Sequence, residues 1–233
     1  MRTHDSVPPV SQERDDAYRA IGRYVTEFSQ LIRVMRVAVA EYVAGDPTQM
    51  DIPEMMLGDQ TARPITNVFF GVCRMVGHLD AAESNVESKL RQEVLTLTEE
   101  RNDYAHGDWI VGEAGFILPA TLPATFLASD PKLVRIRAAR TVGTPRKTLR
   151  ISIADLDAKT DNVQRMLQCV HEFGRLALGL PVRRDDDGKQ VMSRGEYRVR
   201  DVLVVEGGDK KAGKARVEPN GPRARELSWD YGY

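Results

Sequence analysis

The sequence has few cysteines, no long apolar run and almost no net charge, and each shortage excludes a class of protein. Two cysteines, Cys73 and Cys169, are too few for a disulfide framework and lack the paired spacing of a zinc site, so buried free thiols are expected. No segment approaches the roughly 18 apolar residues of a membrane span, and no such run follows Met1 as in a secretion signal. We therefore expect a soluble cytoplasmic protein of bacterial type.

Positive and negative charges are balanced along the chain. The 33 Lys and Arg residues stand against 34 Asp and Glu residues, which gives a formal net charge of -1. Indiscriminate binding to nucleic acid needs a basic face, so the balance argues against that class of protein while leaving room for a local basic pocket. The sequence also lacks an internal repeat, a glycine-rich phosphate loop and a nucleophile elbow. A chain of 233 residues can nevertheless bury a sizeable core.

Apolar residues recur every three or four positions in four segments, which predicts a mainly α-helical fold. Helices are expected over 11–44, from Arg63-Pro64 onward, over 80–105, and from Asp155 or Asp157 to about 178. The first has a heptad-like seam that either packs inside a bundle or associates with a second copy. The apolar positions of the four helices are, in order, Ile21, Val25, Phe28, Ile32, Met35, Val39 and Tyr42; Ile65, Val68, Phe69, Val72, Val76 and Leu79; Val86, Leu90, Val94 and Leu97; and Leu156, Val163, Met166, Leu167, Val170, Phe173 and Leu176.

Outside these helices the pattern changes. Short apolar or alternating runs at 109–111, 115–118, 133–137 and 148–153 predict a hairpin and further strands, and thus a small antiparallel sheet inserted at about 109–153 of a helical domain that spans 11–180. Residues 1–10 are expected to form a flexible arm. Residues 181–233 turn polar and are expected to form a flexible C-terminal tail, with one strand at 197–205. A basic stretch at 207–222 is either solvated or an auxiliary contact to RNA or a partner protein.

Three residues at the end of the third helix form the candidate site. Arg101 follows Leu97 by four positions, so the apolar face of the helix continues into a cation. Asn102 and His106 are also four apart and are therefore neighbours on a helix. Gly107 then favours a helix stop. An arginine, an amide and an imidazole are thus expected to gather where the apolar face ends.

Two interpretations of this group remain open. In the structural one, Arg101 pairs with Glu99, Asp103 or Asp108, because a buried arginine without a partner is costly, and the imidazole caps the helix. In the functional one, His106 carries a proton, since imidazole titrates near neutral pH, and the guanidinium fork binds phosphate oxygens.

The order Arg101-Asn102-three residues-His106 resembles the Arg-x4-6-His motif of the HEPN superfamily, the higher eukaryotes and prokaryotes nucleotide-binding domains. The resemblance implies a HEPN-like helical bundle and a metal-independent endoribonuclease that needs no cofactor. In such an enzyme the ribose 2′-hydroxyl attacks the adjacent phosphorus and leaves a 2′,3′-cyclic phosphate and a 5′-hydroxyl. It also implies a role as a toxin or antiviral-defence effector, with an antitoxin or another protein as partner.

The resemblance also implies a homodimer. One chain supplies one convincing histidine, whereas cleavage needs both a base and an acid, and HEPN ribonucleases bring two motifs together across a two-fold interface. The sequence departs from HepT-type toxins at Asp108, where they carry a tyrosine that an MNT nucleotidyltransferase antitoxin adenylylates. Two alternatives stand beside the nuclease: a non-catalytic HEPN-like domain that binds nucleotide, RNA or protein, and an adaptor in which the motif only locks a helix end.

Overall fold

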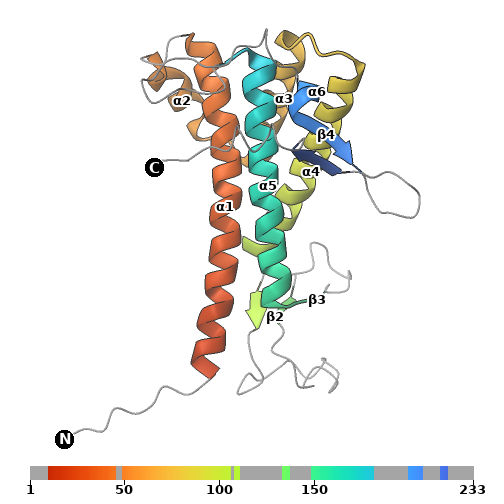
Figure 1. The fold of residues 1–233 in the computed structure, drawn as a ribbon. Coiled ribbons are helices and arrows are strands. Elements are labelled where there is room, and N and C mark those ends of the chain that lie inside the picture. Colours follow the sequence, from red (N-terminus) through yellow and green to blue (C-terminus); the bar gives the residue numbers. More distant parts are fainter. Residues whose placement is uncertain are drawn as a thin grey trace, which may run out of the picture. The chain divides into compact units, whose positions relative to one another are not determined.

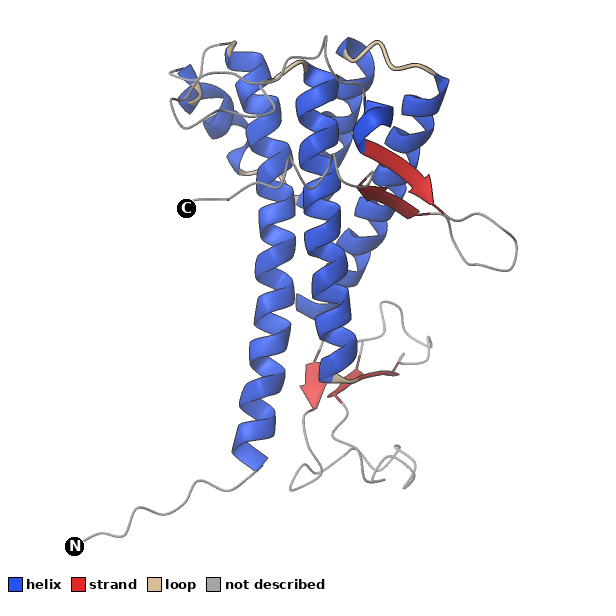
Figure 2. Ribbon diagram, viewed as in Figure 1, coloured by secondary structure: helices blue, strands red, loops and turns tan. Residues whose placement is uncertain are grey.

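The computed structural model describes residues 10–45, 49–105, 108–110, 133–136, 148–180, 199–206 and 216–219. These parts of the chain are mainly helical, as the sequence predicts (Figures 1 and 2). The helices are α1 (Val10–Ala44), α2 (Asp51–Gly58), α3 (Ala62–Val76), α4 (Ala81–Ala105), α5 (Ile153–Leu178) and the single turn α6 (Val199–Val202). The strands are β1 (Asp108–Ile110), β2 (Leu133–Ile136), β3 (Thr148–Ile151), β4 (Leu203–Glu206) and β5 (Arg216–Pro219).

The strands form two antiparallel sheets. The first has the order β1-β2-β3, and in it Asp108 pairs with Ile136 and Leu133 with Ile151. The small antiparallel sheet expected in the sequence between the helices now labelled α4 and α5 is therefore present. The hairpin predicted from 109–111 and 115–118 is not tested, because 111–118 lie outside the described residues. Among the described strands, β1 pairs with β2.

Reciprocal side-chain caps begin two of the long helices. At α4, Asp80 Oδ1 accepts the backbone N–H of Glu83 at 2.9 Å, and Glu83 Oε2 accepts that of Asp80 at 3.0 Å. At α5, Ser152 Oγ accepts the backbone N–H of Asp155 at 3.0 Å, and Asp155 Oδ2 accepts the backbone N–H of Ser152 at 3.0 Å. The prediction that Asp155 or Asp157 begins this helix is thus wrong by a few residues. Asp155 is the third helical residue of a cap that starts at Ser152, and Ile153, expected in a strand, is helical.

Glycines end α1 and α5. Gly45 and Gly179 have φ values of 67° and 68°, in the left-handed region that glycine adopts without steric cost. After α5, Leu180 donates to the carbonyl of Arg175 at 2.8 Å and Gly179 to that of Leu176 at 3.3 Å. This double contact is a Schellman motif, and it places the helix stop where the sequence predicts it.

The chain divides into two compact units. Unit 1 comprises Met1–Glu27 and Glu100–Asn162, and unit 2 comprises Phe28–Glu99 and Val163–Tyr233. Helices α1, α4 and α5 each contribute to both units. The candidate residues Arg101 and Asn102 belong to unit 1, and each unit is described by itself below.

Unit 2 is built around three phenylalanines. The rings of Phe69 and Phe70 meet edge to face at 4.9 Å, and Phe173 lies 6.4 Å from the first and 5.8 Å from the second. Gly174 admits this cluster, because a Cβ there would lie 2.8 Å from the Phe69 ring. Around them are buried, from α1, α3, α4 and α5, Phe28, Leu31, Ile32, Met35, Ile65, Cys73, Val86, Leu90, Val94, Leu97, Val163, Met166, Cys169, Val170 and Leu176.

The predicted helix faces are only partly correct. All four apolar positions of α4 are buried. In α1, however, Tyr42 is 36% exposed, Ile21 and Val25 are half-buried, and Tyr24 is fully buried instead. In α3, Val68 is 39% exposed. Both helices are apolar on more than one side, so periodicity alone leaves the rotation of the helix about its axis undetermined.

The C-terminal strands need a second correction. Residues 199–202 form α6 and only then continue as β4, whereas a strand was predicted over 197–205. β4 pairs with β5, which lies in the basic stretch expected to be flexible, and Val205 faces Val217 in the register. Leu203 and Val217 are buried.

Side chains from two helices hold both backbone groups of Val217, an arrangement that we call the Val217 clasp. Glu93 Oε1 on α4 accepts the N–H of Val217 at 3.0 Å. From α5, Arg165 donates to its carbonyl and Cys169 Sγ lies 3.7 Å from the same oxygen. Arg165 also pairs with Glu93 at 2.7 Å. Glu93 and Arg165 thus form the hydrogen bonds to Val217 that a neighbouring strand would otherwise form at this edge of β5.

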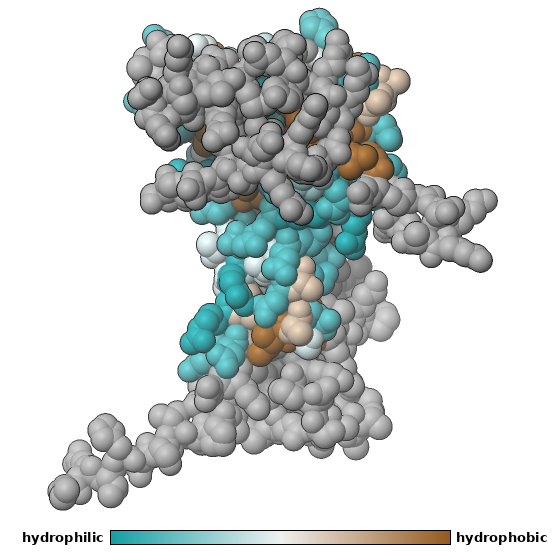
Figure 3. Space-filling model, in the orientation of Figure 1, coloured by the Kyte–Doolittle hydropathy of each residue, from teal (hydrophilic) through white to brown (hydrophobic). Residues whose placement is uncertain are grey.

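The described surface is largely hydrophilic on the face shown in Figure 3, with smaller hydrophobic patches. Both cysteines are buried free thiols, as predicted, and burial raises the pKa of each. None of the helices in the described ranges offers a segment apolar and long enough to traverse a bilayer.

Candidate functional site

The last turn of α4 carries the first two residues of the predicted site. Arg101 is half-buried and Asn102 is exposed. Arg101 Nη1 donates to Asn102 Oδ1 at 3.3 Å, while its Nε is enclosed and makes no hydrogen bond in the described structure. The two side chains therefore lie together on the last turn of α4.

The third residue, His106, lies outside the described residues. The expected proximity of its imidazole to Asn102 and Arg101 is accordingly not tested and stays a prediction. The described helix α4 ends at Ala105, and the helix stop predicted at Gly107 lies outside the described residues.

The two carboxylates that precede Arg101 bind cations from other helices. Glu99, one of the partners considered for Arg101, accepts a hydrogen bond from Arg63 of α3 at 3.3 Å. Glu100 accepts two from Lys159 of α5, each of 2.9 Å. The structural interpretation therefore loses Glu99 as the partner of Arg101.

Two tyrosines pack under this turn in unit 1. Tyr104 of α4 meets Tyr24 of α1 edge to face, with ring centroids 4.9 Å apart, and both are buried. Burial, and to a smaller extent Glu100, raises the pKa of Tyr24 well above its usual range. Its hydroxyl therefore stays protonated and cannot serve as a base near neutral pH.

The two histidines of unit 2 lie in different surroundings. Burial, followed by the nearby Arg175, lowers the pKa of His171 to about 4, so this imidazole is neutral at neutral pH. His78 is exposed just after α3. Its backbone has a φ of 42°, in the left-handed region that non-glycine residues adopt infrequently.

Sequence reasoning missed the residues that surround Arg101. Tyr104 follows Leu97 by seven positions and so continues the buried face of α4, a signal that was available. Lys159 offered no such signal, because it lies 59 positions from Glu100, and only the fold brings the two together.

The comparisons with known proteins return nothing for this chain. No protein-family model, curated protein or solved structure matches it. The functional argument therefore depends on the residues themselves.

Proposed function

We propose that this chain is a metal-independent, HEPN-like endoribonuclease that cleaves RNA with Arg101, Asn102 and His106. The observation that carries the proposal is the pairing of Arg101 and Asn102 on the last turn of a long helix in a mainly helical chain. His106 follows four residues after Asn102 in the sequence. The same order of residues at a helix end characterises the family that the motif resembles.

The chemistry assigns one task to each group. One imidazole takes the proton of the ribose 2′-hydroxyl as this oxygen attacks the adjacent phosphorus, and another gives a proton to the departing 5′-oxygen. The guanidinium stabilises the added charge on the phosphorane. The amide of Asn102 orients the imidazole or binds a phosphate oxygen. The bond to the 5′-oxygen breaks as the 2′,3′-cyclic phosphate closes, so no water is consumed in this step.

A second copy of the chain supplies the second imidazole. A two-fold dimer sets the same surface of each protomer against the other, which brings two histidines and two arginines to one cleft. We propose this homodimer as the active form, acting on cytoplasmic RNA as a toxin or antiviral-defence effector. Sedimentation of the purified chain at micromolar concentration tests the dimer, and a monomer under conditions of full activity would contradict it.

Cleavage of total RNA or tRNA in EDTA tests the activity. We expect His106→Ala and Arg101→Ala each to lower the rate at least about 100-fold, the scale of a lost proton carrier. The products should carry 2′,3′-cyclic phosphates and 5′-hydroxyls. Equal cleavage by wild type and His106→Ala would falsify the proposal.

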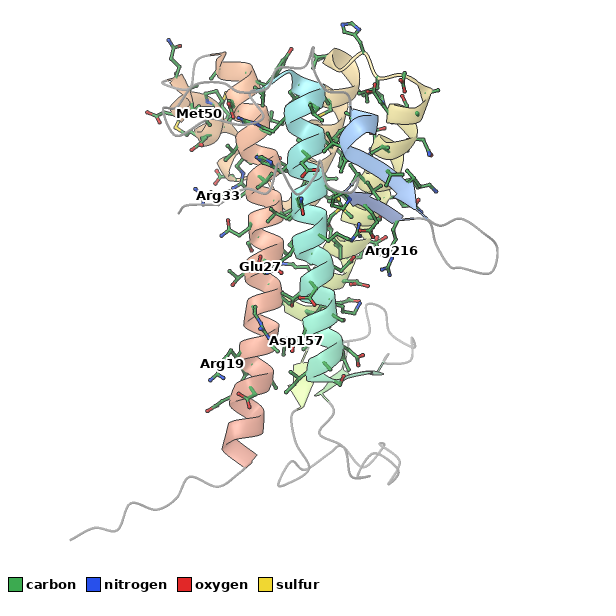
Figure 4. All side chains as sticks on the ribbon, viewed as in Figure 1. Arg19, Glu27, Arg33, Met50, Asp157 and Arg216 are labelled. Carbon is green, nitrogen blue, oxygen red and sulfur yellow. The ribbon has the colours of Figure 1, made fainter. Side chains whose placement is uncertain are left out.

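Matched variants control for the loss of a histidine or an arginine as such. His78→Ala removes an exposed imidazole outside the site. Arg19→Ala removes a guanidinium that projects away from α1 (Figure 4) and is 75% exposed. Both variants should cleave RNA within about twofold of wild type, because surface substitutions of this kind leave the fold intact.

A second candidate function is a HEPN-like domain without catalysis. The observation in its favour is Asp108, which begins β1 two residues after His106 and adds a carboxylate where HepT-type toxins have a tyrosine. This domain would bind nucleotide, RNA or a partner protein through Arg101. Binding of an RNA oligonucleotide that is lost in Arg101→Ala, together with no cleavage of any RNA tested, would select it.

A further inference from the structure

Lys159 touches the last turn of α4 at two points. Its Nζ lies 2.9 Å from both carboxylate oxygens of Glu100 and 6.0 Å from the centroid of the Tyr104 ring. Glu100 and Tyr104 are one helical turn apart and so share a face of α4. Between them in the chain lie Arg101 and Asn102. One ammonium group thus contacts the residues on both sides of the candidate pair.

The neighbouring helix of unit 1 holds the same turn through an aromatic contact. Tyr24 packs edge to face on Tyr104, and both rings are buried. The turn is therefore fixed by an apolar contact from α1 and by a charged one from α5. Since successive helical residues are about 100° apart, a face formed by Glu100 and Tyr104 leaves Asn102 pointing away from it, in agreement with its exposure.

Such fixation matters at this place because helix ends are loosely held. The last four carbonyls of an α-helix have no partner within the helix, and the final turn frays. Arg101 and Asn102 are carried by that turn. The side chains of Lys159 and Glu100 are each 33% exposed, and a pair of this exposure contributes little to global stability. Its effect is therefore expected in local geometry.

We propose, on the basis of the proposed ribonuclease function, that Lys159 is a positioning residue of the site. By holding Glu100 and Tyr104 it keeps Arg101 and Asn102 in the arrangement that stabilises the added charge on the phosphorane. It also neutralises a carboxylate directly before the phosphate-binding arginine. Lys159 itself contacts no reacting atom.

Steady-state cleavage of a single-stranded RNA in EDTA tests this role. We expect Lys159→Met to lower kcat about 10- to 100-fold, because small misplacements of a binding group have effects of this size, while KM changes less than about threefold. Lys159→Arg keeps the charge and the reach to Glu100 and should restore kcat to within about threefold of wild type. A kcat of Lys159→Met equal to that of wild type would overturn the proposal.

Arg23→Met is the matched control. Arg23 of α1 forms an ion pair with Asp157 of α5, and Figure 4 labels Asp157. This pair also joins two helices of unit 1, but its two members belong to α1 and α5 and not to α4. This variant should keep kcat within about twofold of wild type. An equal loss of kcat in Arg23→Met and Lys159→Met would reduce Lys159 to a general stabilising residue and overturn the proposal.

Hydrogen exchange separates this inference from the function on which it depends. We expect Lys159→Met to accelerate exchange of the amides of residues 102–105 about 10-fold, and Arg23→Met to leave them unchanged. Unchanged exchange in Lys159→Met would overturn the positioning role even if wild type cleaves RNA. Conversely, a wild-type protein that cleaves no RNA overturns the proposed function, and the exchange data then show only whether Lys159 fixes the turn.

Discussion

The buried aromatic residues of the two units differ in kind. In unit 2 three phenylalanines contact one another, and Gly174 makes room for them. In the described part of unit 1 the buried rings are the tyrosines Tyr24 and Tyr104, with Lys159 and Glu100 beside them. Apolar packing alone explains the first cluster. The second combines buried tyrosine rings with a partly exposed ion pair, so packing of apolar groups alone does not explain it.

The largest effect on stability is expected from the phenylalanine cluster. Phe173→Ala removes a ring that contacts both Phe69 and Phe70 and should lower the free energy of unfolding by about 3–5 kcal/mol. Urea denaturation measures the loss. Val68→Ala, on an exposed position of α3, serves as control and should change stability by about 0.5 kcal/mol or less. A small loss in Phe173→Ala would show that unit 2 does not depend on this cluster.

A buried carboxyl group in unit 2 should make stability depend on pH. Burial raises the pKa of Glu172 to about 7, although Gln168 donates to it at 3.0 Å. The folded state therefore holds a proton that the unfolded chain releases near pH 4.3, and stability falls as pH rises from about 4.3 to about 7. The neighbouring His171, with its pKa lowered to about 4, has the opposite sign: stability rises from about pH 4 to 6.5.

Glu172→Gln separates the two slopes. Relative to wild type, this variant should gain about 3–4 kcal/mol between pH 4 and pH 8, because of the two slopes only the rising slope of His171 remains. Urea denaturation across this range is the measurement. Asp161→Asn, on an exposed position of the same helix, should follow the wild-type curve. Parallel curves for wild type and Glu172→Gln would contradict the raised pKa.

The next effect compares two glycines in helices. Gly174→Ala places a methyl group 2.8 Å from the Phe69 ring and should cost about 1–3 kcal/mol by overpacking. Gly71→Ala in α3 meets no atom within 4 Å and should instead stabilise the protein by about 0.5–1 kcal/mol. Thermal melting of both variants tests the pair. A change of the same sign in both would argue against the close contact at Gly174.

The smallest effect is expected in unit 1. The hydroxyl of Tyr24 is buried and has no hydrogen-bond partner in the described structure. Tyr24→Phe removes it while keeping the contact with Tyr104, so stability should stay the same or rise by up to about 1 kcal/mol. Tyr24→Ala, which also removes the ring, should cost about 3–5 kcal/mol. A loss above about 1 kcal/mol in Tyr24→Phe would mean that the hydroxyl has a role in the fold.

The sequence correctly predicts which residues are buried in a helix that has a single apolar stripe. In α4 every predicted core position is buried, and the pair Arg101–Asn102 lies on the last turn. The expectation that the apolar face ends there is wrong, because Tyr104 continues the buried face past Arg101. In α3 the predicted core positions Val68 and Val72 are exposed and half-buried, respectively. Phe70 and Cys73, which were not predicted, are buried instead. A helix with apolar residues on several sides does not specify which of them faces the core, because that choice depends on its neighbours.

Long-range contacts explain the other failures. The link from Lys159 to Glu100 joins helices that are separated in the chain by the sheet of unit 1. β5 lies in a run of charged residues that shows no strand pattern. Its residue Val217 is buried because β4 and side chains of α4 and α5 contact it. Neither feature has a local pattern. The relation between His106 and Arg101 stays a prediction.

The Val217 clasp has a practical consequence for anyone who trims this protein. Composition alone would suggest cutting the gene after Pro181, where the sequence turns polar. A truncated product would lack the strand whose amide and carbonyl engage Glu93 and Arg165, and it would expose apolar surface now covered by Leu203 and Val217. We expect such a fragment to melt at a lower temperature than the full chain and to aggregate on purification, so recombinant work should keep the sequence at least through Pro219.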